Sequence, residues 1–208
     1  TLDRSSAASD VYKRQGNIMA IVLASQSPRR QELLARIGVE DFKTLSLDID
    51  ESYPEGLSPE DTVRYIAKKK CDAAAALCAP DDLIITADTM VFLDNDRLGK
   101  PRDEEDALRM LRALSGRGHT VCTGVSVRRG AQEERFAVST RVFFRPMTDD
   151  EIRAYIKTGE PMDKAGAYGV QSRGALFVER IDGDFFNVMG LPVEQLGLVL
   201  ARFGVKLL

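Results

Sequence analysis

The chain has 208 residues, 44% of them hydrophobic, so it can bury a full core as one domain or at most two small lobes. It carries 29 Lys and Arg against 32 Asp and Glu, and this balance of interspersed charges, −3 in total, argues against a general nucleic-acid binder. No run of apolar residues approaches the roughly 18 that span a membrane.

The first 18 residues are small and polar, with no apolar periodicity and no hydrophobic region of a secretory signal. We interpret residues 1–18 as a non-native or disordered leader and expect the natural start at Met19. Residues 19–208 are then expected to form the folded domain.

From Met19 onward, strand and helix patterns alternate. Strands are predicted over residues 21–24, 42–47, 82–87, 90–93, 119–127, 134–144 and 175–181. Helices are predicted over residues 28–37 and 59–77. Three more are expected: one that contains Leu108 and ends at Gly116, one that runs from the capping box at 148–151 through Tyr155, and one that begins near Pro192. No repeat or linker interrupts the series, so we expect a single α/β domain with a mixed, twisted sheet and flanking helices.

The stretch that joins the first strand to the first helix has the composition of an anion cradle. Ser27 is a good N-cap, and Pro28 suits the first helical position. The turn offers hydroxyls, free backbone N–H groups and two guanidinium groups at one point, where a phosphate can bind: Ser25, Arg29 and Arg30. A solvent-exposed helix start with hydrated arginines has the same residue types and remains the alternative.

Carboxylates are the best candidates for acid–base chemistry. The single histidine, His119, falls within a strand pattern, which leaves little room for a histidine-based triad or zinc site. Asp88 follows the predicted strand 82–87, and Glu51 lies in an acidic loop; oxygen ligands of this kind suit Mg²⁺ or Mn²⁺. The alternative for Asp88 is a turn residue that caps its own backbone.

Other cationic and flexible segments are less specific. Lys100 is not part of a Walker A loop, because Asp94 and Pro101 occupy positions that require Gly and Ser or Thr, but it can act as a point charge on phosphate. One of the lysines 68–70 can face a cleft, and the glycine-rich loop 159–174 could hold a base. Three cysteines without metal-type spacing, Cys71, Cys78 and Cys122, indicate a reducing, cytoplasmic compartment.

Several blocks taken together resemble the Maf family, from about Met19 to the C-terminus. They are SQSPRRQELL at 25–34, ADTMV at 87–91, LGKP at 98–101, TGV at 123–125, GEPMDKAGAYGVQ at 159–171 and NVMGLP at 187–192. The resemblance implies a nucleoside triphosphate pyrophosphatase with an α/β fold like that of inosine triphosphatases, a cleft between two lobes, a divalent metal cation and a homodimer.

The resemblance also implies roles for individual residues. Asp88 would prepare water for attack at the α-phosphorus, with Glu51 as the second acidic partner and metal ligand. The triphosphate would be held by Ser25, Arg30, Lys70 and Lys100. Substrate choice would depend on Arg29, Thr89 and Gln171, which resemble the dTTP/UTP subgroup. The alternatives are a pyrophosphatase for modified purine nucleotides of the 7-methyl-GTP type and a nucleotide-sensing regulator of cell division.

Overall fold

A seven-stranded mixed sheet forms the centre of the computed structural model, which describes residues 19–208. The expected leader, residues 1–18, lies outside the described residues. The strand order is β2-β1-β3-β5-β6-β7, and β4 also pairs with β3. The strands are β1 (Ile21–Leu23), β2 (Phe42–Thr44), β3 (Leu83–Leu93), β4 (Asp96–Leu98), β5 (Gly118–Arg129), β6 (Gln132–Phe144) and β7 (Val178–Asp182).

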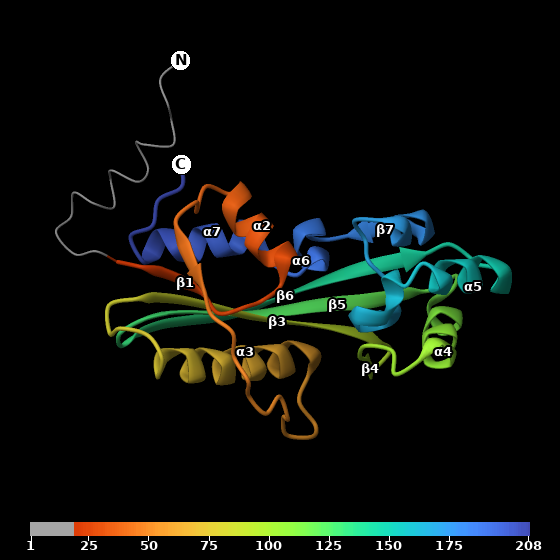
Figure 1. The fold of residues 1–208 in the computed structure, drawn as a ribbon, viewed down its shortest axis with the longest axis horizontal. Coiled ribbons are helices and arrows are strands. Elements are labelled where there is room, and N and C mark those ends of the chain that lie inside the picture. The colour runs from red at the N-terminus through yellow and green to blue at the C-terminus, as the bar shows by residue number, and fades with distance from the viewer. Residues whose placement is uncertain (1–18) are drawn as a thin grey trace, which may run out of the picture.

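Helices cover both faces of the sheet. They are α2 (Pro28–Arg36), α3 (Pro59–Ala75), α4 (Glu104–Leu114), α5 (Asp149–Lys157), α6 (Phe185–Met189) and α7 (Val193–Arg202), with 3₁₀ turns η1 (Glu160–Asp163), η2 (Ala165–Ala167) and η3 (Arg173–Phe177). In Figure 1, α3 lies against one face, α2 and α7 lie against the other, and α4, α5 and β7 form the far end of the molecule. Within residues 19–208, no helix is long and apolar enough to cross a membrane.

The predicted helix starts are confirmed by their caps. The Ser27 hydroxyl accepts a hydrogen bond from the Arg30 N–H at 3.4 Å, and the Ser58 hydroxyl accepts one from the Asp61 N–H at 3.1 Å. Thr148 forms the predicted capping box at the start of α5. The predicted single α/β domain with a mixed sheet is also confirmed.

The predicted break near residue 88 is wrong. Two strands, 82–87 and 90–93, were expected, whereas β3 runs unbroken over Leu83–Leu93. The polar residues Asp88 and Thr89 lie within the ladder, directly opposite Gly124 and Thr123 of β5. Pairing with a long neighbouring strand therefore overrides the local polar signal. The strand predicted over 175–181 likewise begins only at Val178, after η3.

One edge of β3 changes its partner partway along the strand. β1 pairs with it in parallel up to the register Leu23↔Ile85, and β4 pairs with it antiparallel from Val91↔Leu98 onward. Residues 87–90 therefore have a strand neighbour only on the β5 side. We call this stretch of β3 the sheet gap. An interruption of this kind leaves room for side chains to approach the strand edge.

Alternation along β3 sends its side chains into two different environments. Ile85 and Val91 belong to the main core, which includes residues of α2, α4 and α7. Met90 and Phe92 pack with residues of α3 in a smaller cluster. Asp88 therefore points to the α3 side of the gap, while the neighbouring Thr89 points to the α2 side.

Candidate active site

The sheet gap holds a carboxylate that is nearly buried. The Asp88 side chain is 10% exposed, and its Oδ1 accepts a hydrogen bond from Lys70 Nζ at 3.1 Å. Its Oδ2 is buried without a hydrogen-bond partner among the described residues. A buried oxygen left unpaired carries a free-energy cost, which a bound water, cation or substrate group would relieve.

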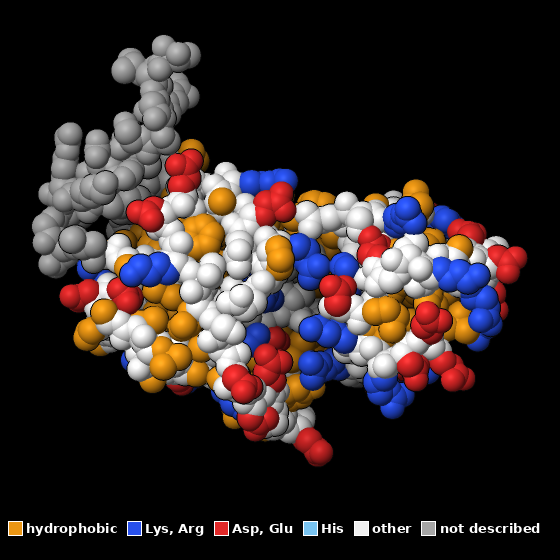
Figure 2. Space-filling view, in the orientation of Figure 1, with side chains coloured by type: hydrophobic (Ala, Val, Ile, Leu, Met, Phe, Trp, Pro, Cys, Tyr) orange, Lys and Arg blue, Asp and Glu red, His pale blue; other side chains and the backbone are white. Residues whose placement is uncertain are grey.

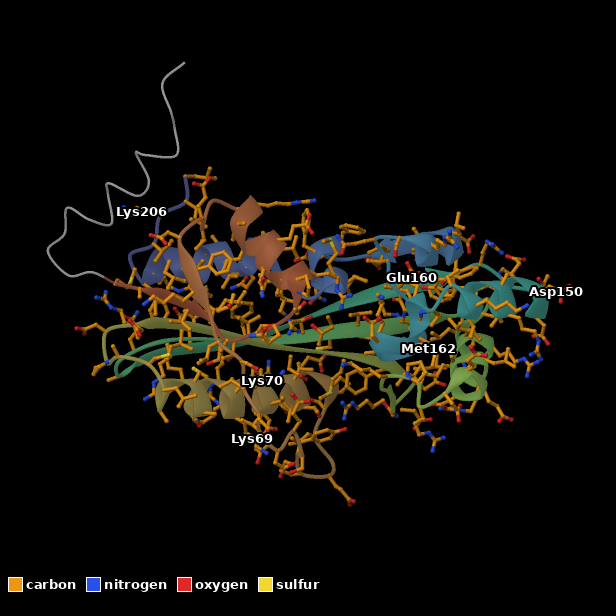
Figure 3. The ribbon with its side chains drawn as sticks, in the orientation of Figure 1. Lys69, Lys70, Asp150, Glu160, Met162 and Lys206 are labelled. Atoms are coloured by element: carbon orange, nitrogen blue, oxygen red, sulfur yellow. The ribbon has the colours of Figure 1, made fainter. Side chains whose placement is uncertain are left out.

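Lys70 links the two predicted acidic residues. Its Nζ donates to the Ala87 carbonyl at 3.1 Å and lies 3.5 Å from Glu51 Oε1, in addition to its bond with Asp88. Figure 3 labels Lys70 on the side of α3 that faces the sheet. The adjacent Lys69 instead donates to the Ser52 carbonyl at 2.9 Å. The helix thus directs Lys70 toward the sheet and Lys69 away from it.

A glycine allows α3 to lie close enough for this contact. Gly124 of β5 is the cross-strand partner of Asp88. A Cβ at Gly124 would lie 2.3 Å from the backbone carbonyl atoms of Val63 in α3. Lys70 is seven residues after Val63, which is about two helical turns and brings it back to the same side of the helix. The close packing at Gly124 therefore sets the distance between Lys70 and Asp88.

Arg30 occupies the α2 side of the gap. Its Nε donates to the Gly190 carbonyl at 2.7 Å, Nη2 to Thr89 Oγ1 at 2.9 Å and Nη1 to Ser25 Oγ at 3.4 Å. Burial lowers the pKa of Arg30, and the negative charge of Asp88 opposes that shift. The guanidinium remains protonated at neutral pH, since its ordinary pKa is so high. Arg30 is therefore a fixed positive charge beside Asp88, with only part of its N–H groups left for a ligand.

Arg29 is close enough to the 159–174 segment for its charge to act on a carboxylate there. It is half-buried at the start of α2. The hydrogen bond from Lys164 lowers the pKa of Asp163, and the positive charge of Arg29 lowers it further. Asp163 ends η1, so the charge of Arg29 acts on the 159–174 segment.

Two predicted residues, Lys100 and Gln171, do not join the hydrogen bonds of the gap. Lys100 is exposed and follows β4; the preceding residue, Gly99, accepts a hydrogen bond from the Gly166 N–H of η2 at 3.1 Å. Gln171 is exposed in the turn before η3. In residues 19–208, neither side chain forms a hydrogen bond to another predicted site residue. Figure 2 shows Lys and Arg side chains near the middle of this face, above a projecting loop rich in Asp and Glu.

The donor set is compatible with a cation such as Mg²⁺, although it is small. Among residues 19–208, no group of three or more His, Cys, Asp or Glu side chains is arranged to hold a metal ion. Asp88 and Glu51 both lie beside Lys70, and Asp88 Oδ2 is an unpartnered hard oxygen. Mg²⁺ usually takes only one or two carboxylates and completes its coordination with water and substrate phosphates. The two residues therefore fit such an ion.

Some residues of the site had no role assigned from the sequence. Thr89 Oγ1 lies 2.8 Å from Thr123 Oγ1, which donates to the Asn187 carbonyl at 3.3 Å. Asn187 is fully buried and donates to the Val121 carbonyl at 3.2 Å. Thr123 and Asn187 lie in the TGV and NVMGLP blocks, so the family motifs did include them. No local pattern, however, indicated that they connect to Arg30 through Thr89.

Comparisons with known proteins add a family to this geometry. The profile of the family described as "Maf-like protein" matches residues 20–203. The chain is 47% identical over 186 residues to the dTTP/UTP pyrophosphatase of Bacillus velezensis, a match that covers 89% of this chain and 97% of that protein. It is 45% identical over 177 residues to the dTTP/UTP pyrophosphatase of Bacteroides thetaiotaomicron, with 85% and 92% covered.

Solved structures show a similar fold at low sequence identity. The HAM1 protein of Coxiella burnetii superposes with a TM-score of 0.53 at 15% identity, covering 88% of this chain and 99% of that chain. The Ham1 protein of Staphylococcus aureus gives a TM-score of 0.51 at 14% identity, with the same coverage. The predicted resemblance in fold is confirmed.

Proposed function

This chain belongs to the Maf family, and on that basis we propose that it hydrolyses nucleoside triphosphates, dTTP and UTP above all, to the monophosphate and pyrophosphate. Modified pyrimidine triphosphates are included as substrates, so the reaction would remove unwanted nucleotides from the cellular pool. The proposal takes its substrates from relatives that match nearly the whole chain, and its chemistry from the arrangement around Asp88.

The observation that carries the proposal is the position of Asp88 between fixed positive charges. One carboxylate oxygen binds Lys70, while the other is buried and unpartnered at the sheet gap. Arg30 lies on the far side of the same gap, held through Thr89. A phosphoryl-transfer site needs an oxygen that accepts a proton from water and cations that stabilise charge on phosphate, and both are present here.

In the proposed reaction, Asp88 Oδ2 accepts a proton from a water molecule. The water oxygen attacks the α-phosphorus as the bond to the bridging oxygen of pyrophosphate breaks. Lys70 holds Oδ1 of Asp88 and so fixes the orientation of the carboxylate, with Oδ2 left for the water. Asp88 and Glu51 would hold a Mg²⁺ or Mn²⁺ ion, which when bound supplies positive charge to the phosphate oxygens.

The remaining cations would bind and orient the triphosphate. Ser25 and the part of Arg30 not engaged by the protein lie at the start of α2, where phosphate oxygens are favoured. Lys100 is exposed and free of ion pairs in the described part of the chain, so it can reach the departing pyrophosphate. Arg29, Thr89 and Gln171 are proposed to select pyrimidine nucleotides.

Replacement of Asp88 tests the chemistry. Asp88→Asn keeps the shape of the side chain but removes the proton acceptor, so turnover should fall by a factor of roughly 10² or more. Pyrophosphate release should be measured over all common nucleotides with Mg²⁺ or Mn²⁺, and circular dichroism should show the parental fold. Asp150→Asn, at an exposed position in α5 far from the gap, is the matched control and should keep full activity (Figure 3).

Two outcomes would redirect the proposal. Parental turnover by Asp88→Asn would remove this residue from the mechanism. A panel in which methylated purine triphosphates are preferred would favour the modified-purine alternative, and tight nucleotide binding without pyrophosphate release would favour a sensor.

We also propose a cytoplasmic homodimer that binds no nucleic acid. Cys71 and Cys122 are buried free thiols, as a reducing compartment allows. The near balance of charge argues against a nucleic-acid partner. Size-exclusion chromatography with light scattering gives the mass in solution, and a mass of one chain, 23.0 kDa, would contradict the dimer.

A further inference from the structure

We propose that Glu160 is a positioning residue that fixes the turn carrying Gln171 and thereby sets the preference for the nucleotide base. The inference rests on the proposed function, because Gln171 is expected to contact the base only if nucleotides bind. Glu160 is labelled in Figure 3, in the end of the molecule that contains α5 and β7.

The Glu160 carboxylate holds three successive residues of the turn that follows Gln171. Its Oε1 accepts hydrogen bonds from the Arg173 N–H at 3.1 Å and from the hydroxyl of Ser172. Its Oε2 accepts a hydrogen bond from the Gly174 N–H at 3.0 Å. A carboxylate that accepts several N–H bonds is a strong, directional restraint on a backbone segment.

No cation competes for this carboxylate. In the described part of the chain, no Lys or Arg side chain forms an ion pair with Glu160, and the nearby Lys164 ammonium donates to its backbone carbonyl and to Asp163 instead. The negative charge of Glu160 is therefore balanced by the N–H dipoles of the turn, as in an anion nest. The conformation of the turn therefore depends on this one side chain more than it would on an ordinary surface glutamate.

The turn has little else to hold its outer part. Gln171, Ser172 and Arg173 are all exposed, so burial contributes little to their positions. The base of the turn is tight: a Cβ at Gly174 would lie 2.3 Å from the Gly169 carbonyl oxygen, and the Gly169 N–H donates to Tyr155 Oη at 3.1 Å. The ends of the turn are therefore fixed by packing, while its exposed middle is fixed by Glu160.

The turn also belongs to the segment that faces the gap. Glu160 begins η1, which leads into Gly166 of η2, and a Cβ at Gly166 would lie 3.0 Å from the Val91 side chain of β3, next to the gap. Gly166 is also bonded to the carbonyl beside Lys100. Loss of Glu160 should thus disturb recognition of the base without disturbing the cations that hold phosphate.

Steady-state kinetics of Glu160→Ala test the inference. We expect the KM for dTTP and UTP to rise by about tenfold, the scale of one charge-assisted hydrogen bond, with kcat little changed. The Ki of pyrophosphate as a competitive inhibitor should stay at the parental value, because pyrophosphate carries no base. Glu160→Gln keeps one acceptor and should restore part of the affinity. Glu179→Ala, at an exposed glutamate of β7, is the matched control.

Hydrogen exchange provides a readout that does not need turnover. The amides of Arg173 and Gly174 should exchange faster in Glu160→Ala, while those of β3 remain protected. Equal weakening of pyrophosphate and nucleotide, a fall in kcat at constant KM, or unchanged amide exchange would overturn the inference.

Binding in the Asp88→Asn background separates this inference from the proposed function. If the parent releases no pyrophosphate but Asp88→Asn binds UTP more tightly than Asp88→Asn/Glu160→Ala does, the hydrolytic function fails and the role of Glu160 stands. If UTP binds equally to both or to neither, the role of Glu160 is overturned.

Discussion

His119 is a buried core residue. It lies in β5 with no exposed surface, and its Nε2 is 2.7 Å from Tyr168 Oη. Its ring makes edge contacts with Phe144 and Tyr168 at centroid distances of 5.1 and 5.3 Å. The prediction that the histidine belongs to a strand is confirmed.

The burial of His119 makes stability depend on pH. Burial, together with the positive charge of Arg141, lowers its pKa from 6.5 to about 3. In the unfolded chain, His119 therefore binds a proton below about pH 6.5, whereas in the folded chain it binds one only below about pH 3. The free energy of unfolding should fall as the pH drops through this window.

Denaturant unfolding at pH 7 and pH 4.5 measures this effect. We expect His119 to account for a loss of about 2 kcal/mol between these pH values. The His119→Gln variant has no titratable group at this position. Its free energy of unfolding should therefore fall less over the same interval, by the amount expected for His119, whatever its stability at pH 7. Equal losses in the two proteins would mean that His119 titrates normally.

The Thr89 hydroxyl is bonded to Arg30, and we predict that it affects substrate choice partly through this guanidinium. Its hydroxyl accepts from Arg30 and lies 2.8 Å from Thr123 Oγ1. Thr89→Ala should therefore release the guanidinium and shift the ratio of kcat/KM for UTP against that for ATP by about tenfold, with little change in Tm. Thr89→Ser keeps the hydroxyl and should retain the parental ratio. An unchanged substrate profile in Thr89→Ala would count against its place in the base pocket.

Among the elements, the packing of α3 on β5 has the greatest consequence for the site. Gly124 leaves room for the Val63 backbone, and the same helix delivers Lys70 to Asp88. The position of Lys70 thus depends on Gly124, the cross-strand neighbour of Asp88, whose missing side chain lets α3 approach the sheet. The ion pair between Lys70 and Asp88 therefore requires the short distance between α3 and the sheet as well as the two charged residues.

Substitution at Gly124 tests this dependence. Gly124→Ala should lower the free energy of unfolding by about 2 kcal/mol, because the new Cβ overlaps backbone that cannot move alone. Turnover of the remaining folded protein should fall as well, since α3 must shift away from Asp88. Gly197→Ala in α7 meets no atom within 4 Å and should stabilise the protein by about 0.5–1 kcal/mol at parental activity. Full activity in folded Gly124→Ala would separate helix placement from catalysis.

At the scale of the whole molecule, the site lies where the sheet changes partners. The β1 end packs with α2 and α7, and the far end packs with α4 and α5 (Figure 1). Between them, residues 87–90 lack a strand on one edge, and the loop containing Glu51 approaches there. The two ends of the molecule are not separate domains, because one long sheet supports both.

The sequence by itself determined the fold class, the helix starts and the family. Caps such as Ser27 and Thr148 act within a few residues, so local chemistry predicted them correctly. The motif blocks also contained four of the residues that meet at the gap, Ser25, Arg30, Asp88 and Thr89, and the family resemblance added Lys70. Their roles in substrate binding and catalysis remain predictions.

Only the tertiary structure decided on which face of the sheet each of these side chains lies. Asp88 and Thr89 were expected at a strand end, but pairing with β5 continues the strand and sends their side chains to opposite faces. Which lysine meets Asp88, and which oxygen of Asp88 stays free, depends on the distance that Gly124 permits. Such contacts join residues far apart in the chain, and the energy that fixes them comes from packing, which no local pattern records.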